Sequence, residues 1–139
     1  MKLAEVKDVD LLLALFQLCN NEITGRKRFQ KMVCILKNRN NIPFSFSFKP
    51  YFYGPYSEEL ANLIEIMKGA GLIEEETSSI APGIVQYRYH LLRKGEQLFQ
   101  RSPVRERRHM LDLLRNEVDE LRTLPTNDLV SLAKRQNLS

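Results

Sequence analysis

The chain has 139 residues, of which 43% are hydrophobic and 27% charged, as expected for one soluble globular domain with a modest core. Its formal net charge of +4 permits an acidic partner such as nucleic acid without requiring one. Its two cysteines, Cys19 and Cys34, and its lack of a bilayer-length apolar run argue against disulfide-rich secreted and membrane proteins and predict a cytoplasmic protein with reduced thiols.

Two helices are predicted in the first forty residues. Asp8 or Asp10 can cap the first helix, which ends at Asn20–Asn21 and carries a broad apolar surface: Leu11, Leu12, Leu15, Phe16, Leu18 and Cys19. An apolar surface of that width predicts a central helix. Thr24 is placed to cap the second helix, over residues 26–37, whose apolar side chains fall on one face.

An aromatic stretch follows, with seven of the twelve aromatic residues between positions 44 and 57. Phe44, Phe46 and Phe48 alternate with polar residues, which predicts a half-buried strand that the prolines at 50 and 55 confine to an edge. The remaining tyrosines flank the Gly-Pro turn, where a ring can keep its hydroxyl in water. They are the candidate contact residues, for stacked bases or for a protein: Tyr51, Tyr53 and Tyr56.

A third helix is predicted from a cap at Ser57 to the glycines at 69 and 71. Its predicted outward residues are mostly acidic: Glu58, Glu59, Asn62, Glu65 and Lys68. Residues 57–76 hold six glutamates against one lysine, a local charge of −5. Duplex DNA would be repelled by such a face, so ordinary major-groove readout by this helix is disfavoured.

Two strands are then predicted, from Leu72–Ile73 into three glutamates and from Ile84 to Leu91, joined by a polar turn over 77–83 and followed by a helix from about Arg93. This order predicts an α+β, mostly helical fold: a winged helix-turn-helix-type domain over residues 1–102 with a small antiparallel β-wing. Leu92 cannot cap the helix that follows the wing, so the sequence does not define the residue at which that helix begins.

The remainder, residues 103–139, is predicted to be a helical extension. An apolar stripe runs through Val104, Leu111, Leu114, Val118 and Leu121, and Thr126 is placed to cap a last short helix. Two alternatives stay open: the stripe packs on the preceding domain, or it associates with a second copy in a homodimer.

Three passages together resemble the YwgA-like proteins and, more distantly, the Panacea domain: "GRKRFQK" from Gly25, "FKPYFYGPYSEEL" from Phe48, and "GLIEEE" with "YRYHLLRKGEQL". The resemblance covers about residues 8 to 100. It implies a compact domain of winged-helix type among regulators and toxin–antitoxin partners, and it brings no catalytic chemistry with it.

No catalytic, metal or cofactor site is expected from the residues, since the two histidines belong to no ligand cluster and the glycines are scattered. The candidate nucleic-acid or anion-binding residues form two basic clusters, Arg26, Lys27, Arg28 and Lys31 in the second helix, and Arg105 and Arg108 near the start of the extension. The sequence therefore predicts a non-enzymatic regulatory binding module. Its partner is duplex nucleic acid, bound through the basic clusters, or a toxin-like protein, bound through the acidic helix and the tyrosines.

Overall fold

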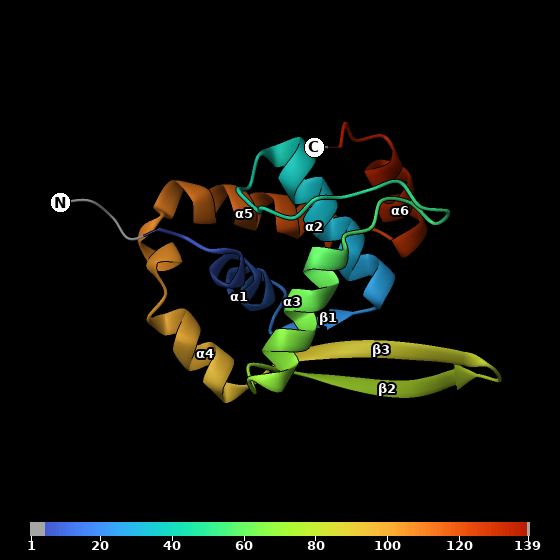
Figure 1. Ribbon diagram of the computed structural model, residues 1–139, viewed down its shortest axis with the longest axis horizontal. Helices are drawn as coiled ribbons and strands as arrows, with labels where there is room; N and C mark the ends of the chain where they lie inside the picture. The colour runs from blue at the N-terminus through green and yellow to red at the C-terminus, as the bar shows by residue number, and fades with distance from the viewer. Residues whose placement is uncertain (1–4, 139) are drawn as a thin grey trace.

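The computed structural model describes residues 5–138. It contains six α-helices, a 3-10 helix and one small antiparallel sheet, so the predicted α+β, mostly helical class is confirmed (Figure 1). The elements in chain order are α1 (Asp8–Leu18), β1 (Glu22–Thr24), α2 (Arg26–Asn40), α3 (Glu58–Gly69), β2 (Ile73–Ala81), β3 (Ile84–Leu91), α4 (Arg93–Gln100), the 3-10 helix (Pro103–Glu106), α5 (Arg108–Leu121) and α6 (Thr126–Lys134).

Helix α1 is the central element, as its broad apolar surface predicted. Every residue from Leu11 to Phe16 is fully buried, and α4, α5 and β3 all pack against this helix. Its start is fixed by Asp10, whose Oδ2 accepts a hydrogen bond from the Lys7 backbone N–H at 2.8 Å. The other carboxylate oxygen, Oδ1, accepts a hydrogen bond from the Ser102 hydroxyl at 2.5 Å, which ties the end of α4 to the core.

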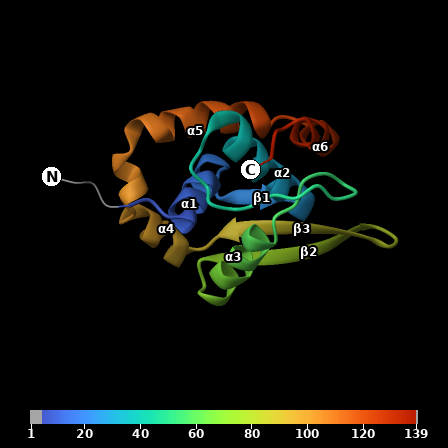
Figure 2. The same ribbon diagram turned by 45° about the horizontal axis from the view of Figure 1, so that its top comes forward.

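The sheet has the strand order β1-β3-β2, and both pairings are antiparallel. The β2–β3 hairpin extends well beyond the helices in both views (Figures 1 and 2). The strand β1 was not predicted, because three residues between two helices carry almost no periodic signal. The predicted polar turn over 77–83 is also wrong, since β2 continues to Ala81 and only Pro82–Gly83 form the turn.

The segment between α2 and α3 has the predicted alternation but not the predicted strand. Phe44, Phe46 and Phe48 are buried while Ser45 and Ser47 are exposed. No ladder forms along them, and the segment makes only an isolated bridge between Lys49 and Tyr56. The alternation of buried and exposed side chains therefore indicates an extended chain with one buried side rather than a strand in a sheet.

The sequence predicted that three hydroxyl side chains cap helices, and the structure confirms one of these caps. The Ser57 hydroxyl caps α3 by accepting a hydrogen bond from the Leu60 N–H at 3.1 Å. Thr24 instead ends β1 and leaves Gly25 as the N-cap of α2, and Thr126 is the first residue of α6 rather than its cap. Leu92 precedes α4 without a side-chain cap bond.

The C-terminal helices pack against the N-terminal ones within the same chain. Helix α5 lies against α1 and α2, with Leu114, Val118 and Leu121 fully buried, and α6 lies against α2 (Figure 2). An ion pair from Arg39 Nη2 to Glu117 Oε2 at 2.9 Å joins the end of α2 to α5. Among the described residues, no helix is both long and apolar enough to cross a membrane.

Candidate functional site

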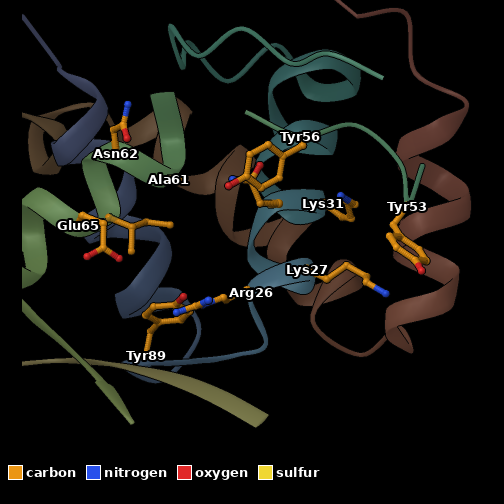
Figure 3. Close-up of a pocket in the computed structure, with 11 residues that line it drawn as sticks. Arg26, Lys27, Lys31, Tyr53, Tyr56, Ala61, Asn62, Glu65 and Tyr89 are labelled. Atoms are coloured by element: carbon orange, nitrogen blue, oxygen red, sulfur yellow. The ribbon is translucent and has the colours of Figure 1, made fainter. Parts of the chain in front are cut away.

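A cleft of about 410 Å³ opens between α2, α3 and the turn that precedes α3; we call it the α2–α3 cleft. Helix α2, the turn, α3 and β3 each contribute to its wall (Figure 3). The lining residues are Arg26, Lys27, Gln30, Lys31, Tyr53, Tyr56, Ala61, Asn62, Ile64, Glu65 and Tyr89. The cleft therefore brings together much of the basic cluster of α2 and two of the candidate contact tyrosines, which the sequence had placed in separate hypotheses.

The turn is fastened to α2 by three side-chain hydrogen bonds. Gln30 donates from Nε2 to the Ser57 carbonyl at 2.9 Å and accepts at Oε1 from the Ser57 N–H at 2.9 Å. Lys31 donates from Nζ to the Pro55 carbonyl at 2.7 Å. Because Ser57 also caps α3, these bonds set where α3 begins relative to α2.

Gly54 is a point where the backbone of the turn lies close to the side chains of α2 and α6. Its φ of +98° suits glycine, and a Cβ built there would lie 3.2 Å from Lys31 Cε and 3.5 Å from Val130 Cγ1. The Gly-Pro sequence thus lets the backbone lie directly on the Lys31 side chain and on α6.

Lys31 is a buried cation, with only 3% of its surface exposed. Burial lowers the pKa of its ammonium, and the nearby charges of Lys27 and Lys134 lower this pKa further. Among residues 5–138, no carboxylate forms an ion pair with Lys31, and its ammonium donates to the Pro55 carbonyl. The sequence predicted an anion-binding role for Lys31, and in the structure its ammonium also supports the turn from within the fold.

Arg26 is held by an acid of the sheet. Its Nη2 lies 3.0 Å from Glu75 Oε1, and its guanidinium stacks 3.7 Å from the centre of the Tyr87 ring. Burial raises the pKa of Glu75, but hydrogen bonds from Tyr89 and Arg26 and the charges of Arg26 and Lys68 outweigh it, so this pKa lies below its ordinary value. Glu75 is therefore a fixed structural ion that holds Arg26 against the sheet.

Beside the cleft, four rings form a surface that we call the aromatic loop: Tyr51, Phe52, Tyr53 and Tyr56. Phe52 is 86% exposed, Tyr53 64% and Tyr51 51%. The rings contact one another edge to face, with Tyr51–Tyr56 centroids 5.7 Å apart and Phe52–Tyr53 centroids 5.0 Å apart. Lys27 extends from α2 toward the Tyr53 ring, and its Nζ lies 4.8 Å from the centre of that ring (Figure 3).

Other predicted residues lie outside the cleft. Arg28 faces the opposite side of α2 and donates to the carbonyls of Leu121 and Arg122 at 3.2 and 2.8 Å, so it joins α2 to the end of α5. Arg105 and Arg108 are exposed at the start of the C-terminal extension, on other elements than the basic cluster of α2. The two predicted basic clusters therefore do not share the cleft.

Of the predicted contact residues of α3, some line the cleft and others lie outside it. Glu58, Glu59, Asn62 and Glu65 are exposed, as predicted. Glu65 and Asn62 line the cleft, whereas Glu59 Oε1 accepts a hydrogen bond from the Ser47 N–H at 2.6 Å. Glu58 lies with Tyr51 beside a second, shallower hollow of about 360 Å³ that shares Lys31, Tyr53 and Tyr56.

Three functional neighbours were missed from the sequence: Gln30, Glu75 and Tyr89. A signal for Gln30 was present, since Gln30 and Lys31 are the polar pair inside an otherwise apolar run from Phe29 to Leu36. Two adjacent polar side chains in such a run must find partners inside the fold. Within residues 5–138, no three His, Cys, Asp or Glu side chains gather closely enough to hold a metal ion.

Comparison with known proteins supports the resemblance seen in the sequence. No family model matches the chain. Over 76 residues it is 42% identical to the protein named "Uncharacterized protein YwgA" of Bacillus subtilis (strain 168). The chain is YwgA-like. The match covers 55% of this chain and 45% of the relative, so it spans about half the length of each. The more distant resemblance to the Panacea domain stays a prediction.

Proposed function

We propose that this protein is a non-enzymatic, cytoplasmic binding module of winged-helix type that docks a protein partner on its aromatic loop. The winged-helix assignment rests on the element order α1-β1-α2-α3-β2-β3 and on the strand order β1-β3-β2, with a hairpin that projects from the body. Residues 41–57 replace the short turn of about 3–4 residues that normally joins the two helices of a helix-turn-helix. That insertion carries the aromatic loop.

The observation that carries the proposal is the exposure of Phe52 and Tyr53 on a loop that is firmly held at its base. Aromatic side chains are enriched at the centres of protein interfaces, because they supply much contact area with few rotatable bonds. The bonds from Gln30 and Lys31 to residues 55–57 fix the end of this loop before a partner arrives. A loop held in this way loses less conformational entropy on binding.

The charges of α3 favour a protein over duplex DNA. The helix that would enter the major groove of DNA presents Glu58, Glu59 and Glu65 to solvent. Three of the predicted cationic ligands, Arg28, Lys31 and Arg105, already donate to backbone carbonyls. Nucleic-acid binding through the two basic clusters stays a prediction, and it competes with the protein proposal in the test below.

The test is affinity capture of the tagged full-length protein from its native host. We expect a stoichiometric protein to be recovered with the wild type and lost with the double variant Phe52→Ala, Tyr53→Ala. The matched control is Ile84→Ala, Val85→Ala, because these side chains are also apolar and exposed but lie at the hairpin tip. A solitary monomer, or equal recovery with the two double variants, would contradict the proposal.

A further inference from the structure

The charged residues that line the α2–α3 cleft do not balance. Arg26 is paired with Glu75 at 3.0 Å, and Glu65 is paired with Lys68 at 3.1 Å. Two cations are left over, Lys27 and Lys31, for which no ion pair occurs among residues 5–138. They lie four residues apart and therefore on one face of α2, where like charges destabilise a helix.

The buried member of this pair has unused donors. An ammonium group has three N–H donors, and Lys31 uses one of them on the Pro55 carbonyl at 2.7 Å. A charge taken out of water is unfavourable unless a counter-charge compensates it. Lys134, which packs against the turn at Gly54, adds a third positive charge to the surroundings of Lys31 instead of a compensating one. The fold thus holds a cation where an anion would relieve the imbalance.

We propose that the α2–α3 cleft binds a small organic carboxylate whose charged end lies against Lys31 and Lys27 and whose apolar body lies against Tyr53, Tyr56 and Ile64. The cleft volume of about 410 Å³ lies in the usual range for small-molecule sites. The rings and the side chains of Ala61 and Ile64 supply an apolar wall, and Lys27 already lies over the Tyr53 ring at the rim. This site does not depend on the protein-docking proposal.

The chemistry favours a carboxylate over a phosphate. A carboxylate carries one negative charge and matches a single buried ammonium, whereas a phosphate dianion would lose more hydration energy on entering a partly apolar cleft. Phosphate sites usually add several backbone N–H groups or a bidentate arginine. Here Arg26 is engaged by Glu75, and the Gln30 amide is engaged by both backbone groups of Ser57.

The inference is tested by NMR titration of the isotope-labelled full-length protein with phenylacetate, with the neutral phenylacetamide as matched ligand. We expect phenylacetate to cause saturable shifts confined to residues that line the cleft, with a Kd on the order of 1 mM, as for a fragment of this size. Phenylacetamide should bind at least tenfold more weakly. Equal binding of the two ligands, or shifts that map outside the cleft, would overturn the inference.

Two lysine variants make the test specific. Lys27→Met should weaken phenylacetate binding about three- to tenfold, whereas Arg115→Met, which removes an exposed cation of α5 that does not line the cleft, should leave it unchanged. Lys31→Met should abolish binding, with the Leu60 amide resonance reporting whether α3 keeps its cap. Wild-type affinity in a folded Lys31→Met protein, or in Lys27→Met, would contradict the site.

Discussion

The side-chain amide of Gln30 makes hydrogen bonds to both backbone groups of Ser57, donating to its carbonyl and accepting from its N–H, each at 2.9 Å. Ser57 is fully buried, and its hydroxyl caps α3. One side chain of α2 therefore satisfies the residue at which α3 begins. The 17 residues between the two helices are not a free loop, because their last residues are fixed to α2 by this pair and by Lys31.

Replacement of Gln30 by alanine should destabilise the fold strongly. It leaves the Ser57 N–H buried without a partner, at a cost of roughly 1–3 kcal/mol. The Ser57 carbonyl loses one of its two hydrogen bonds but still accepts from the Ala61 N–H at 3.2 Å. We expect the free energy of unfolding in urea to fall by about 1–3 kcal/mol. The control is Gln97→Ala, at an exposed position of α4, for which a change within about 0.5 kcal/mol is expected. A loss below that limit at Gln30 would show that the turn is not held as described.

Gly54→Ala and Gly69→Ala should have opposite effects on stability. At Gly54 the backbone has a φ of +98°, and a Cβ would crowd Lys31 Cε at 3.2 Å, so a loss of about 1–2 kcal/mol or more is expected. At Gly69, in the last turn of α3, a Cβ meets nothing within 4 Å, so alanine should leave stability unchanged or raise it by up to about 1 kcal/mol. Equal losses in urea unfolding would contradict the close approach at Gly54.

Stability should fall at alkaline pH because of the two thiols. Burial raises the pKa of Cys19 and of Cys34 from the ordinary 9.0 to about 11, against the lowering effect of nearby cations. Between these values the unfolded chain loses the thiol protons and the folded chain keeps them, so the free energy of unfolding decreases as the pH rises from 9 to 11.

The measurement for this prediction is urea unfolding across that pH range, with Cys34→Ala beside the wild type. The alanine variant should show a shallower decrease with pH, because one of the two groups is gone. A decrease of the same slope in both proteins would mean that the Cys34 thiol does not contribute. The folded wild type should also react slowly with iodoacetamide at pH 8, since the thiolate is the reactive form.

Duplex DNA should bind weakly and without help from the predicted cations. We expect fluorescence anisotropy at 50 and 200 mM salt to give affinities for wild type and for Lys27→Ala, Arg105→Ala, Arg108→Ala that differ by less than about threefold. A variant with the same loss of charge elsewhere, Arg115→Ala, Lys134→Ala, Arg135→Ala, is the control. A steep salt dependence that only the first variant loses would favour nucleic acid as the partner.

The sequence predicted the helices well where a long apolar face had to be buried. The centre of α1 and the stripe of Leu114, Val118 and Leu121 are buried as the pattern indicated. The cap at Ser57 was also predictable, because a serine followed by two glutamates is a strong start signal. The strand at 44–48 was predicted wrongly, since alternation shows that one side of a chain is buried but not that a neighbouring strand exists to pair with it.

The site was predicted only by residue type. The sequence singled out the basic cluster at the start of α2, but its side chains point in different directions: Arg26 to Glu75, Arg28 to the end of α5, and Lys31 into the turn. Such contacts join residues 24 to 94 positions apart, and no local pattern encodes them. The meeting of Lys27 with Tyr53 depends on the path of residues 41–57, which only the three-dimensional structure gives.

The most direct test of the central claim, that the aromatic loop docks a protein, is site-specific photo-crosslinking. A benzoylphenylalanine placed at Phe52 keeps an exposed ring at the loop, and the same group placed at Val85 samples the hairpin tip as a control. We expect irradiation in the native host to give one discrete protein adduct from position 52 and none from position 85. Adducts with nucleic acid, or protein adducts from position 85 alone, would contradict the account.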